Sequence, residues 1–415
     1  MLEELYSKKS VTTLERIRCC WLKQPIADYL KKLFALGYKR SGLKVLAHDL
    51  IWFADFVSRQ GDREIANLPR WIEPFLKQLS PRKDGNSTWR SAISRFVDHL
   101  VREGQIPKVP EVVPERPHAE LVDEYLAFVS EHRGICREHT KNIRRLCVAF
   151  FDFLAGREIV ELQDIRPDTI HDFIIAEGIR YNRTTISDRC SMLRRFLVHL
   201  FRQGFIGRDL AQAVMSPRIY RQEQCPRFLT LTEIREVLAA IDRNTDRGRR
   251  DYAMILLLTV YGLRGIEVIR LRLDDIDWRG QRLQVIRRKA GNTTTYPLAA
   301  AVGDAILGYL KHSRPASSHR QVFLSLNAPF RPVAWTAQLG VSVRKYMAKA
   351  GIQVERPGTH TFRYSCAQRL FEQNMPLKFI GDYLGHRDIG STQRYTKIAL
   401  EQLREVAIGD GEDLL

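Results

Sequence analysis

Apolar side chains recur at helical spacing through most of the chain. One such stripe is made by Ile143, Leu146, Cys147, Phe150, Phe153 and Leu154. This spacing places them on one side of a helix and predicts a long amphipathic element with that side in a core. Lys141, Arg144 and Arg145 lie near the start of this element and can face outward.

Two proline-containing stretches with little periodicity interrupt the helical pattern, at residues 107–118 (PKVPEVVPERPH) and 216–227 (SPRIYRQEQCPR). Proline fixes its own φ and disfavours helix in the residue before it, so both stretches are predicted to be linkers. They divide the chain into segments of residues 1–106, 119–215 and 228–415.

The first two segments look like copies of one helical unit. Residues 95–106 (RFVDHLVREGQI) and 195–206 (RFLVHLFRQGFI) share seven identities, and Gly37 and Asp55 recur as Gly134 and Asp152. Each segment is predicted to run helix, glycine turn, long helix, intervening helix and a last helix closed by glycine. Chance similarity between amphipathic helices is the alternative to duplication.

The third segment mixes helices with a small sheet. Thr230 and Glu233 form a capping box that predicts a helix to about Ala240. A second helix is expected over about 250–261, followed by strands at 281–287 and 293–297 that form a hairpin around Lys289. Further helices are expected at about 299–311, 334–350, 361–373, 376–384 and 391–406. The fold class is therefore mainly α (α+β), with two helical modules before a mostly helical domain with a small antiparallel sheet.

Charge points to a polyanionic partner. The net charge of the 415 residues is +18, divided as +8 over residues 1–110, zero over 111–220 and +10 over 221–415. Such an excess favours nucleic acid, because each neutralised phosphate releases condensed counterions, although an acidic membrane surface would also attract it. Arg194, Arg195 and Arg202 add basic side chains to the last helix of the second segment.

The sequence gives no sign of secretion or of a membrane span. The N-terminus is acidic (MLEEL), and the apolar run at 254–260 is too short to cross a bilayer. The seven cysteines form no C-x-x-C pair, which favours reduced thiols over a disulfide framework or a zinc site. We therefore expect a cytoplasmic protein.

The third segment also holds the residue types that metal-independent phosphodiester transfer requires: a nucleophile, several cations and an acid. They occur in the order YGLRGIE (261–267), Lys289, GTHTFR (358–363), LGH (384–386) and Tyr395. On these motifs, residues 226–406 resemble the tyrosine recombinase (phage integrase) family, whose R…K…H-x-x-R…H…Y series is matched in full and in order. Phe362 and Tyr364 stand where the family usually has Leu and often has His, and neither removes a charged group.

The resemblance implies a role for each residue. Tyr395 would attack the scissile phosphate and hold the DNA 3′ end as a phosphotyrosine. Arg264 and Arg363 would clamp the non-bridging oxygens, since guanidinium offers a bidentate fork that stays protonated.

The remaining roles concern protons and orientation. The resemblance implies that Lys289 protonates the leaving 5′ oxygen, that His360 is a general base, and that His386 donates a hydrogen bond to a phosphate oxygen. Glu267, three residues after Arg264, would orient that arginine, and an exposed helix position is its structural alternative.

The resemblance also implies partners and a domain plan. Residues 119–215 are similar to a SAM-like core-binding domain and residues 228–415 to the catalytic domain, while residues 1–106 are an extra DNA-binding module. Double-stranded DNA, a homotetramer on two DNA sites, and accessory or sister recombinases are the expected partners. No cofactor and no metal are expected, and residues 398–406 (IALEQLREV) could pack on a neighbouring subunit or on their own domain.

Three other functions stay open. A type IB topoisomerase would use the same chemistry as a monomer, and a catalytically silent DNA-binding relative would keep the fold alone. Asp274, Asp275 and Asp277 could serve a metal-dependent transposase, although carboxylates crowded into one turn more often cap local structure and stay solvated.

Overall fold

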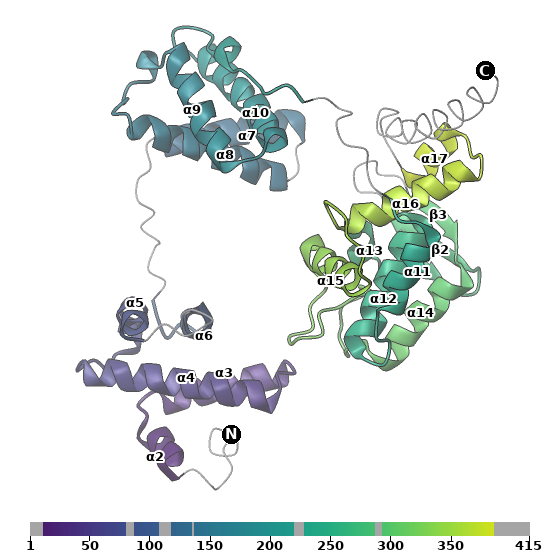
Figure 1. Cartoon of the computed structure of the whole chain (residues 1–415). Coiled ribbons are helices and arrows are strands. Elements are labelled where there is room, and N and C mark those ends of the chain that lie inside the picture. Colours follow the sequence, from purple (N-terminus) through teal and green to yellow (C-terminus); the bar gives the residue numbers. More distant parts are fainter. Residues whose placement is uncertain are drawn as a thin grey trace, which may run out of the picture. The chain divides into compact units, whose positions relative to one another are not determined.

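The computed structural model describes residues 11–79, 87–107, 118–134, 137–219, 228–286 and 293–385 (Figure 1). By its internal contacts the chain divides into two compact units, residues 110–224 and residues 1–109 together with 225–415. The second unit contains separate hydrophobic cores for its N-terminal and C-terminal parts. Within the described ranges, we find no helix that is both long and apolar enough to cross a membrane.

The N-terminal module is entirely helical in its described part. Its elements are α2 (Val11–Cys19), α3 (Lys23–Ala35), α4 (Arg40–Arg59), η1 (Ile65–Asn67), α5 (Leu68–Gln78) and α6 (Ser87–Arg102). Gly37 turns the chain between α3 and α4 at φ +89°, and Gly104 follows α6 at φ +75°. Both glycines adopt the left-handed conformation that L-residues with a Cβ rarely adopt, which explains the predicted glycine turns.

The second module repeats the order of helices from α3 to α6. Its elements are α7 (Ala119–Arg133), α8 (Arg137–Ala155), η2 (Leu162–Asp164), α9 (Pro167–Arg180), α10 (Arg183–Arg202) and η3 (Ala211–Ala213). Gly134 and Gly204 have positive φ, as Gly37 and Gly104 do in the first module. The order helix, glycine turn, long helix, intervening helix and last helix is therefore present in both, as the sequence predicted.

The two modules also share a buried aromatic cluster. In each, a tyrosine from the helix before the glycine turn contacts a phenylalanine and a histidine from the last helix. The clusters are Tyr29, Phe96 and His99 in one module and Tyr125, Phe196 and His199 in the other. The tyrosine–histidine ring centroids lie 4.8 Å apart in the first cluster and 4.9 Å apart in the second. Equivalent packing at equivalent places supports duplication over chance similarity.

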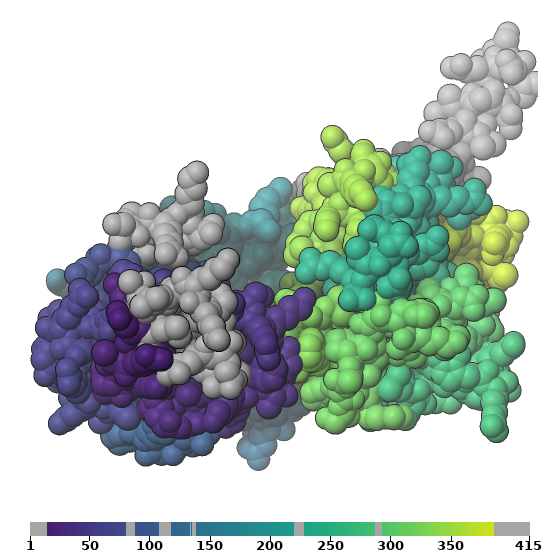
Figure 2. Space-filling view, turned by 90° about the horizontal axis from the view of Figure 1, so that it is seen from below, coloured from purple at the N-terminus to yellow at the C-terminus, as the bar shows by residue number. Residues whose placement is uncertain are grey.

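The C-terminal part forms a mixed domain, coloured from green to yellow in the space-filling view (Figure 2). Its helices are α11 (Leu231–Ala239), α12 (Asp246–Tyr261), α13 (Gly265–Arg270), η4 (Leu273–Asp275), α14 (Ala300–His312), α15 (Thr336–Lys349), α16 (Thr359–Glu372) and α17 (Leu377–Leu384). The predicted capping box is present, because the Thr230 hydroxyl accepts from the backbone N–H of Glu233 while the Glu233 carboxylate accepts from that of Thr230. The helix predicted over 391–406 lies outside the described residues.

A three-stranded antiparallel sheet contains the predicted hairpin. The strands are β1 (Ile276–Asp277), β2 (Arg282–Ile286) and β3 (Thr293–Pro297), in that order. Leu283 pairs with Tyr296, and both side chains are buried. The short strand β1 was not predicted, because two residues cannot show an alternating pattern.

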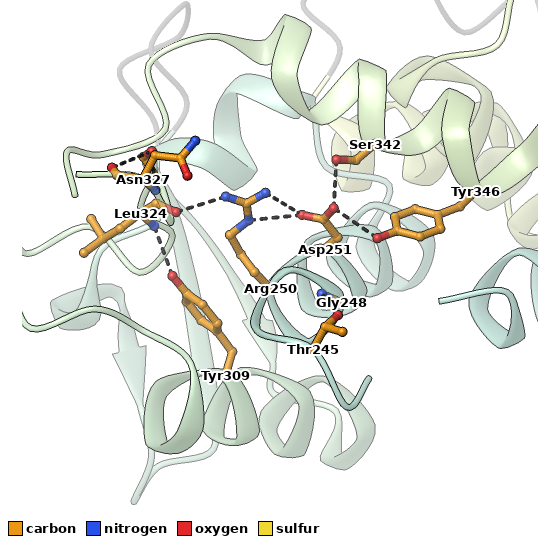
Figure 3. A network of polar contacts seen from close by, with 10 residues as sticks. Thr245, Gly248, Arg250, Asp251, Tyr309, Leu324, Asn327, Ser342 and Tyr346 are labelled. Atoms are coloured by element: carbon orange, nitrogen blue, oxygen red, sulfur yellow. Dashed lines mark hydrogen bonds and ion pairs between the residues drawn. The ribbon is translucent and has the colours of Figure 1, made fainter. Parts of the chain in front are cut away.

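A buried polar network joins α12 to α15 and to the segment after α14 (Figure 3). The carboxylate of Asp251, 1% exposed, accepts from Arg250 at 2.8 Å and from the Ser342 hydroxyl at 2.8 Å. Arg250 also donates to the backbone carbonyl of Leu324, whose N–H donates to the Tyr309 hydroxyl. These bonds satisfy a buried charge and fix the N-terminal half of α12.

Candidate active site

The structure describes three of the six predicted catalytic residues: Arg264, His360 and Arg363. Lys289, His386 and Tyr395 lie outside the described residues. The flanking elements are described, however, because Lys289 lies between β2 and β3 and His386 follows the last residue of the described range, Gly385.

The loop that carries Arg264 begins at a tightly enclosed glycine. Gly262 ends α12 with φ +61°, and a Cβ at this position would lie 2.6 Å from a methyl carbon of Leu384. Both the conformation and the space therefore require glycine. The chain turns here and places Arg264 as the N-cap of α13.

Glu267 holds Arg264, as the resemblance implied. Its carboxylate accepts from the backbone N–H of Arg264 at 2.8 Å and from the guanidinium at 2.9 Å. The side chain of Glu267 is 5% exposed and that of Arg264 is 33% exposed. The pair thus anchors the base of the arginine in the protein while part of its guanidinium remains accessible to a ligand.

Arg363 approaches the same loop from inside the domain. It is 4% exposed and donates to the carbonyl oxygen of Gly262 at 2.6 Å and to that of Leu384. Arg264 donates to the next carbonyl, that of Gly385, at 3.0 Å. Successive carbonyls at the C-terminal end of α17 therefore each accept from one of the two arginines, which concentrates positive charge where an anion could bind.

His360 lies at the exposed start of the helix that carries Arg363. Thr359 is the first residue of α16, and a Cβ on Gly265 would lie 3.2 Å from its hydroxyl oxygen. The start of α16 therefore packs against the start of α13, next to Arg264. The positive end of the α16 helix dipole adds to the charge of the two arginines in this region.

Gly385 ends α17 in the left-handed conformation, with φ 66°. The sequence predicted a helix end at this position, directly before His386. Two of the carbonyls that the arginines hold, those of Leu384 and Gly385, thus belong to the residues that immediately precede a predicted catalytic histidine.

The three clustered aspartates have local partners. Asp274 pairs with Arg320, which lowers the pKa of its carboxyl, and Asp275 accepts from the backbone N–H of Arg272. Asp277 accepts from the backbone N–H of Gly280. In the part of the chain that the structure describes, no three His, Cys, Asp or Glu side chains gather as a metal site.

Sequence reasoning assigned no role to three tyrosines that connect the segments around this site: Tyr261, Tyr296 and Tyr383. The available signal was Tyr296, the single aromatic residue in the strand TTTYP, at a position that alternation directs into the core.

Comparison with known proteins agrees with these motifs. The sequence profile of the phage integrase family matches residues 227–402. The integrase/recombinase y4rA of Sinorhizobium fredii (strain NBRC 101917 / NGR234) is 34% identical over 317 residues, which are 76% of this chain and 76% of that protein. The chain belongs to the phage integrase family. It is a tyrosine recombinase.

The recombinase also resembles two further proteins, over different shares of its length. The integrase/recombinase y4rF of the same strain is 27% identical over 418 residues, covering 98% of this chain and 95% of that protein, so the match includes the N-terminal module. A lambda integrase solved as a tetramer bound to a Holliday junction has a TM-score of 0.52 at 16% identity, over 73% of this chain and 86% of that one. This second likeness supports the fold, which is mainly helical with a small antiparallel sheet.

Proposed function

We propose that this tyrosine recombinase cleaves and rejoins DNA at specific sites through a 3′-phosphotyrosine intermediate, to integrate, excise or transpose a mobile element. The proposal rests on one observation. Arg264 and Arg363, two members of a complete R…K…H-x-x-R…H…Y series, donate hydrogen bonds to successive backbone carbonyls at the C-terminal end of α17.

In the proposed reaction, the Tyr395 hydroxyl loses its proton to His360 and its oxygen bonds to the scissile phosphorus. Arg264 and Arg363 donate to the non-bridging oxygens as negative charge builds up on them, and His386 adds one hydrogen bond. A phenol with an ordinary pKa near 10 is a weak nucleophile at neutral pH, so this positive site must also favour the developing phenolate.

The bond from phosphorus to the 5′ oxygen then breaks, and Lys289 supplies a proton to that oxygen. Rejoining reverses these steps: a 5′ hydroxyl gives its proton to Lys289 and attacks the phosphotyrosine, and Tyr395 leaves with the proton that His360 returns to its oxygen. Glu267 is assigned no proton transfer: its carboxylate binds the backbone N–H and the guanidinium of Arg264, and its proposed role is to orient that arginine.

The proposal includes double-stranded DNA as substrate and a homotetramer on two DNA sites as the active assembly. The solved lambda integrase tetramer on a Holliday junction is the precedent for this arrangement. Accessory or sister recombinases are further proposed partners. A chromosomal substrate would place the protein in the cytoplasm, with the nucleoid.

We also propose that residues 1–106 form a second DNA-binding module beside the core-binding domain at 119–215. Exposed basic residues recur at matching places in the two copies: Lys44 and Lys141, Arg95 and Arg195, Arg102 and Arg202. Repetition of surface charge is not needed for the common fold, whereas contact with a phosphate backbone would require it.

The test starts by finding the substrate. Sheared genomic DNA of the source organism is incubated with the protein, and fragments that remain attached in SDS are sequenced to locate the cleavage site. A duplex of that sequence with a nick beside the site then traps the covalent complex. Tyr395→Phe should still bind this duplex but form no covalent complex, since the attacking oxygen is gone. A trapped complex with this variant would contradict the assignment of the nucleophile.

The same duplex distinguishes the proposed function from the three alternative functions. A topoisomerase would relax supercoiled DNA without exchanging strands between two sites, and a silent relative would bind without covalent attachment. A metal-dependent transposase would lose cleavage in a chelator, whereas the proposed chemistry continues without divalent metal.

A further inference from the structure

Three tyrosine rings from three separate segments pack in a row beside the site, one pair tilted and the other edge to face, and we name them the tyrosine ladder. Tyr261 is the last residue of α12, Tyr296 lies in β3 and Tyr383 lies in α17. The ring centroids of Tyr261 and Tyr296 are 5.2 Å apart, and those of Tyr296 and Tyr383 are also 5.2 Å apart. Tyr261 and Tyr296 are each 3% exposed.

Hydroxyl groups of the ladder bind the backbone of neighbouring segments. The Tyr261 hydroxyl donates to the carbonyl of Pro297 at 2.8 Å and accepts from the N–H of Ala299 at 2.8 Å. The Tyr296 hydroxyl donates to the carbonyl of Tyr383 at 2.6 Å. One hydroxyl therefore ties α12 to the end of β3, and the other ties β3 to α17.

The segments that the ladder joins are those that carry the chemistry. Tyr261 precedes Gly262, whose carbonyl accepts from Arg363, and the loop continues to Arg264. Strand β3 follows the segment with Lys289. Tyr383 precedes the two residues whose carbonyls the arginines hold, and His386 comes next in the sequence.

Packing alone does not explain why these residues are tyrosines. Phenylalanine would stack equally well, and a buried hydroxyl costs free energy unless it is hydrogen-bonded. Burial raises the pKa of Tyr261 and of Tyr383 above the usual value, so neither phenol ionises near neutral pH. The hydroxyls therefore serve as fixed hydrogen-bonding groups rather than as proton carriers.

We propose that Tyr261 and Tyr296 are positioning residues, whose hydroxyls hold strand β3 against the arginine loop and α17, and that the proton donation assigned to Lys289, which precedes β3 in the sequence, depends on these bonds. The inference rests on the proposed function, in which Lys289 protonates the 5′ oxygen. Misplacing a catalytic group by about 1 Å can slow a reaction by roughly 100-fold, so two hydrogen bonds on this strand can control the rate.

The experiment compares Tyr261→Phe and Tyr296→Phe with wild type in single-turnover cleavage of the nicked duplex. Tyr309→Phe is the matched control, because its buried hydroxyl also bonds a backbone N–H, that of Leu324, but in the network of Figure 3. Each ladder variant should cleave about 10- to 100-fold more slowly, and Tyr309→Phe should cleave within about 3-fold of wild type.

A second substrate tests whether proton donation is the step that is slowed in the two ladder variants. It carries sulfur in place of the bridging 5′ oxygen, and a thiolate leaves without a proton because thiols are far more acidic than alcohols. Lys289→Ala should recover most of its rate on this duplex, and so should both ladder variants. A general loss of structure would slow both substrates equally.

The results distinguish failure of the inference from failure of the proposed function. Ladder variants that match wild type on the ordinary duplex, or that stay equally slow with sulfur, would overturn the inference. If one variant fails to fold, the rate and rescue of the other decide. A wild-type protein that attaches covalently to no fragment would overturn the proposed function itself. A Lys289→Ala variant that sulfur does not rescue would overturn the role of the lysine, and the inference with it.

Discussion

At the scale of single residues, Glu267 provides a test of how Arg264 is held. Glu267→Gln keeps an oxygen that can accept from the backbone N–H but removes the charge that pairs with the guanidinium. We expect cleavage to slow by about 10-fold or more, because the arginine loses its fixed orientation. The measurement is single-turnover cleavage at saturating DNA.

Glu233→Gln is the matched control for this change. Glu233 occupies the same place in the capping box of α11 as Glu267 does in that of α13, but the residue that it caps is Thr230, whereas Glu267 caps Arg264. Equal slowing in both variants would show that the effect comes from the helix cap, and would remove the orienting role from Glu267.

Arg363→Lys tests whether two directed hydrogen bonds are needed or only a positive charge. A lysine ammonium is a compact point charge and cannot reproduce the fork that reaches the carbonyls of Gly262 and Leu384. We expect cleavage to slow by about 100- to 1,000-fold, with a smaller change in DNA affinity. Arg369→Lys, in the same helix and bonded to the carbonyl of Thr259, should change the rate little. Comparable losses in the two variants would contradict this view of Arg363.

The order of the predicted catalytic motifs could be seen in the sequence. The residues that hold these motifs in place could be predicted only in part. Arg264, His360 and Arg363 were predicted as catalytic because their residue types and spacing are specific, and their catalytic roles stay a prediction. Glu267 was found because three residues along a helix is one turn. The ladder could not be found, because Tyr261, Tyr296 and Tyr383 are far apart in the sequence and meet only after β3 packs between α12 and α17.

At the scale of the elements, the repeated histidine cluster predicts acid sensitivity in both helical modules. Burial lowers the pKa of His99 and of His199 below the usual value near 6.5. The unfolded chain therefore binds protons on these residues at a higher pH than the folded chain does. Their contribution to stability is present above about pH 6.5 and is lost as the pH falls below it, by up to about 1.4 kcal/mol for each unit of pKa difference.

The check is chemical unfolding of wild type and of His99→Phe/His199→Phe at about pH 7.5 and about pH 5.5. Wild type should lose more stability on acidification than the double variant, whose phenylalanines do not titrate. Burial dominates at both histidines, so both modules should be sensitive. At His99 the charge of Lys32 opposes the effect of Glu103, 3.8 Å away, and at His199 Glu124 only partly offsets burial. Identical pH dependence in both proteins would contradict the prediction.

Helix capping explains why α12 starts earlier than the sequence pattern predicted. The helix expected from about 250 begins at Asp246, because the Thr245 hydroxyl caps the N–H of Gly248. The apolar pattern starts only later, since the first turns of α12 bury Gly248 and the charged Asp251 rather than aliphatic residues. A hydrophobic pattern cannot indicate a buried charged residue, so the predicted start of the helix was too late in the sequence.

At the scale of the whole molecule, the duplicated modules predict that DNA affinity and catalysis can be separated. Deleting residues 1–106 leaves the predicted chemistry intact, so covalent cleavage at saturating DNA should persist at a similar rate. The protected stretch of DNA in a footprint should shorten and site choice should relax. Unchanged affinity and footprint would refute a DNA-binding role for the first module.

A sharper test keeps the full-length chain and reverses the charge of single basic residues in the first module. Lys44→Glu and Arg102→Glu alter basic positions that recur in the second module as Lys141 and Arg202, whereas Lys31→Glu alters an exposed lysine with no basic counterpart there. If the repeated positions contact phosphates, each of the first two variants should reduce the slope of log affinity against log salt by about 0.9, and Lys31→Glu should not. The rate of covalent cleavage at saturating DNA should be the same in all three, because none of these residues belongs to the catalytic series. Equal salt slopes for the three variants would show that the excess charge of this module acts only as a diffuse field, and that its repeated positions were kept for some purpose other than holding DNA.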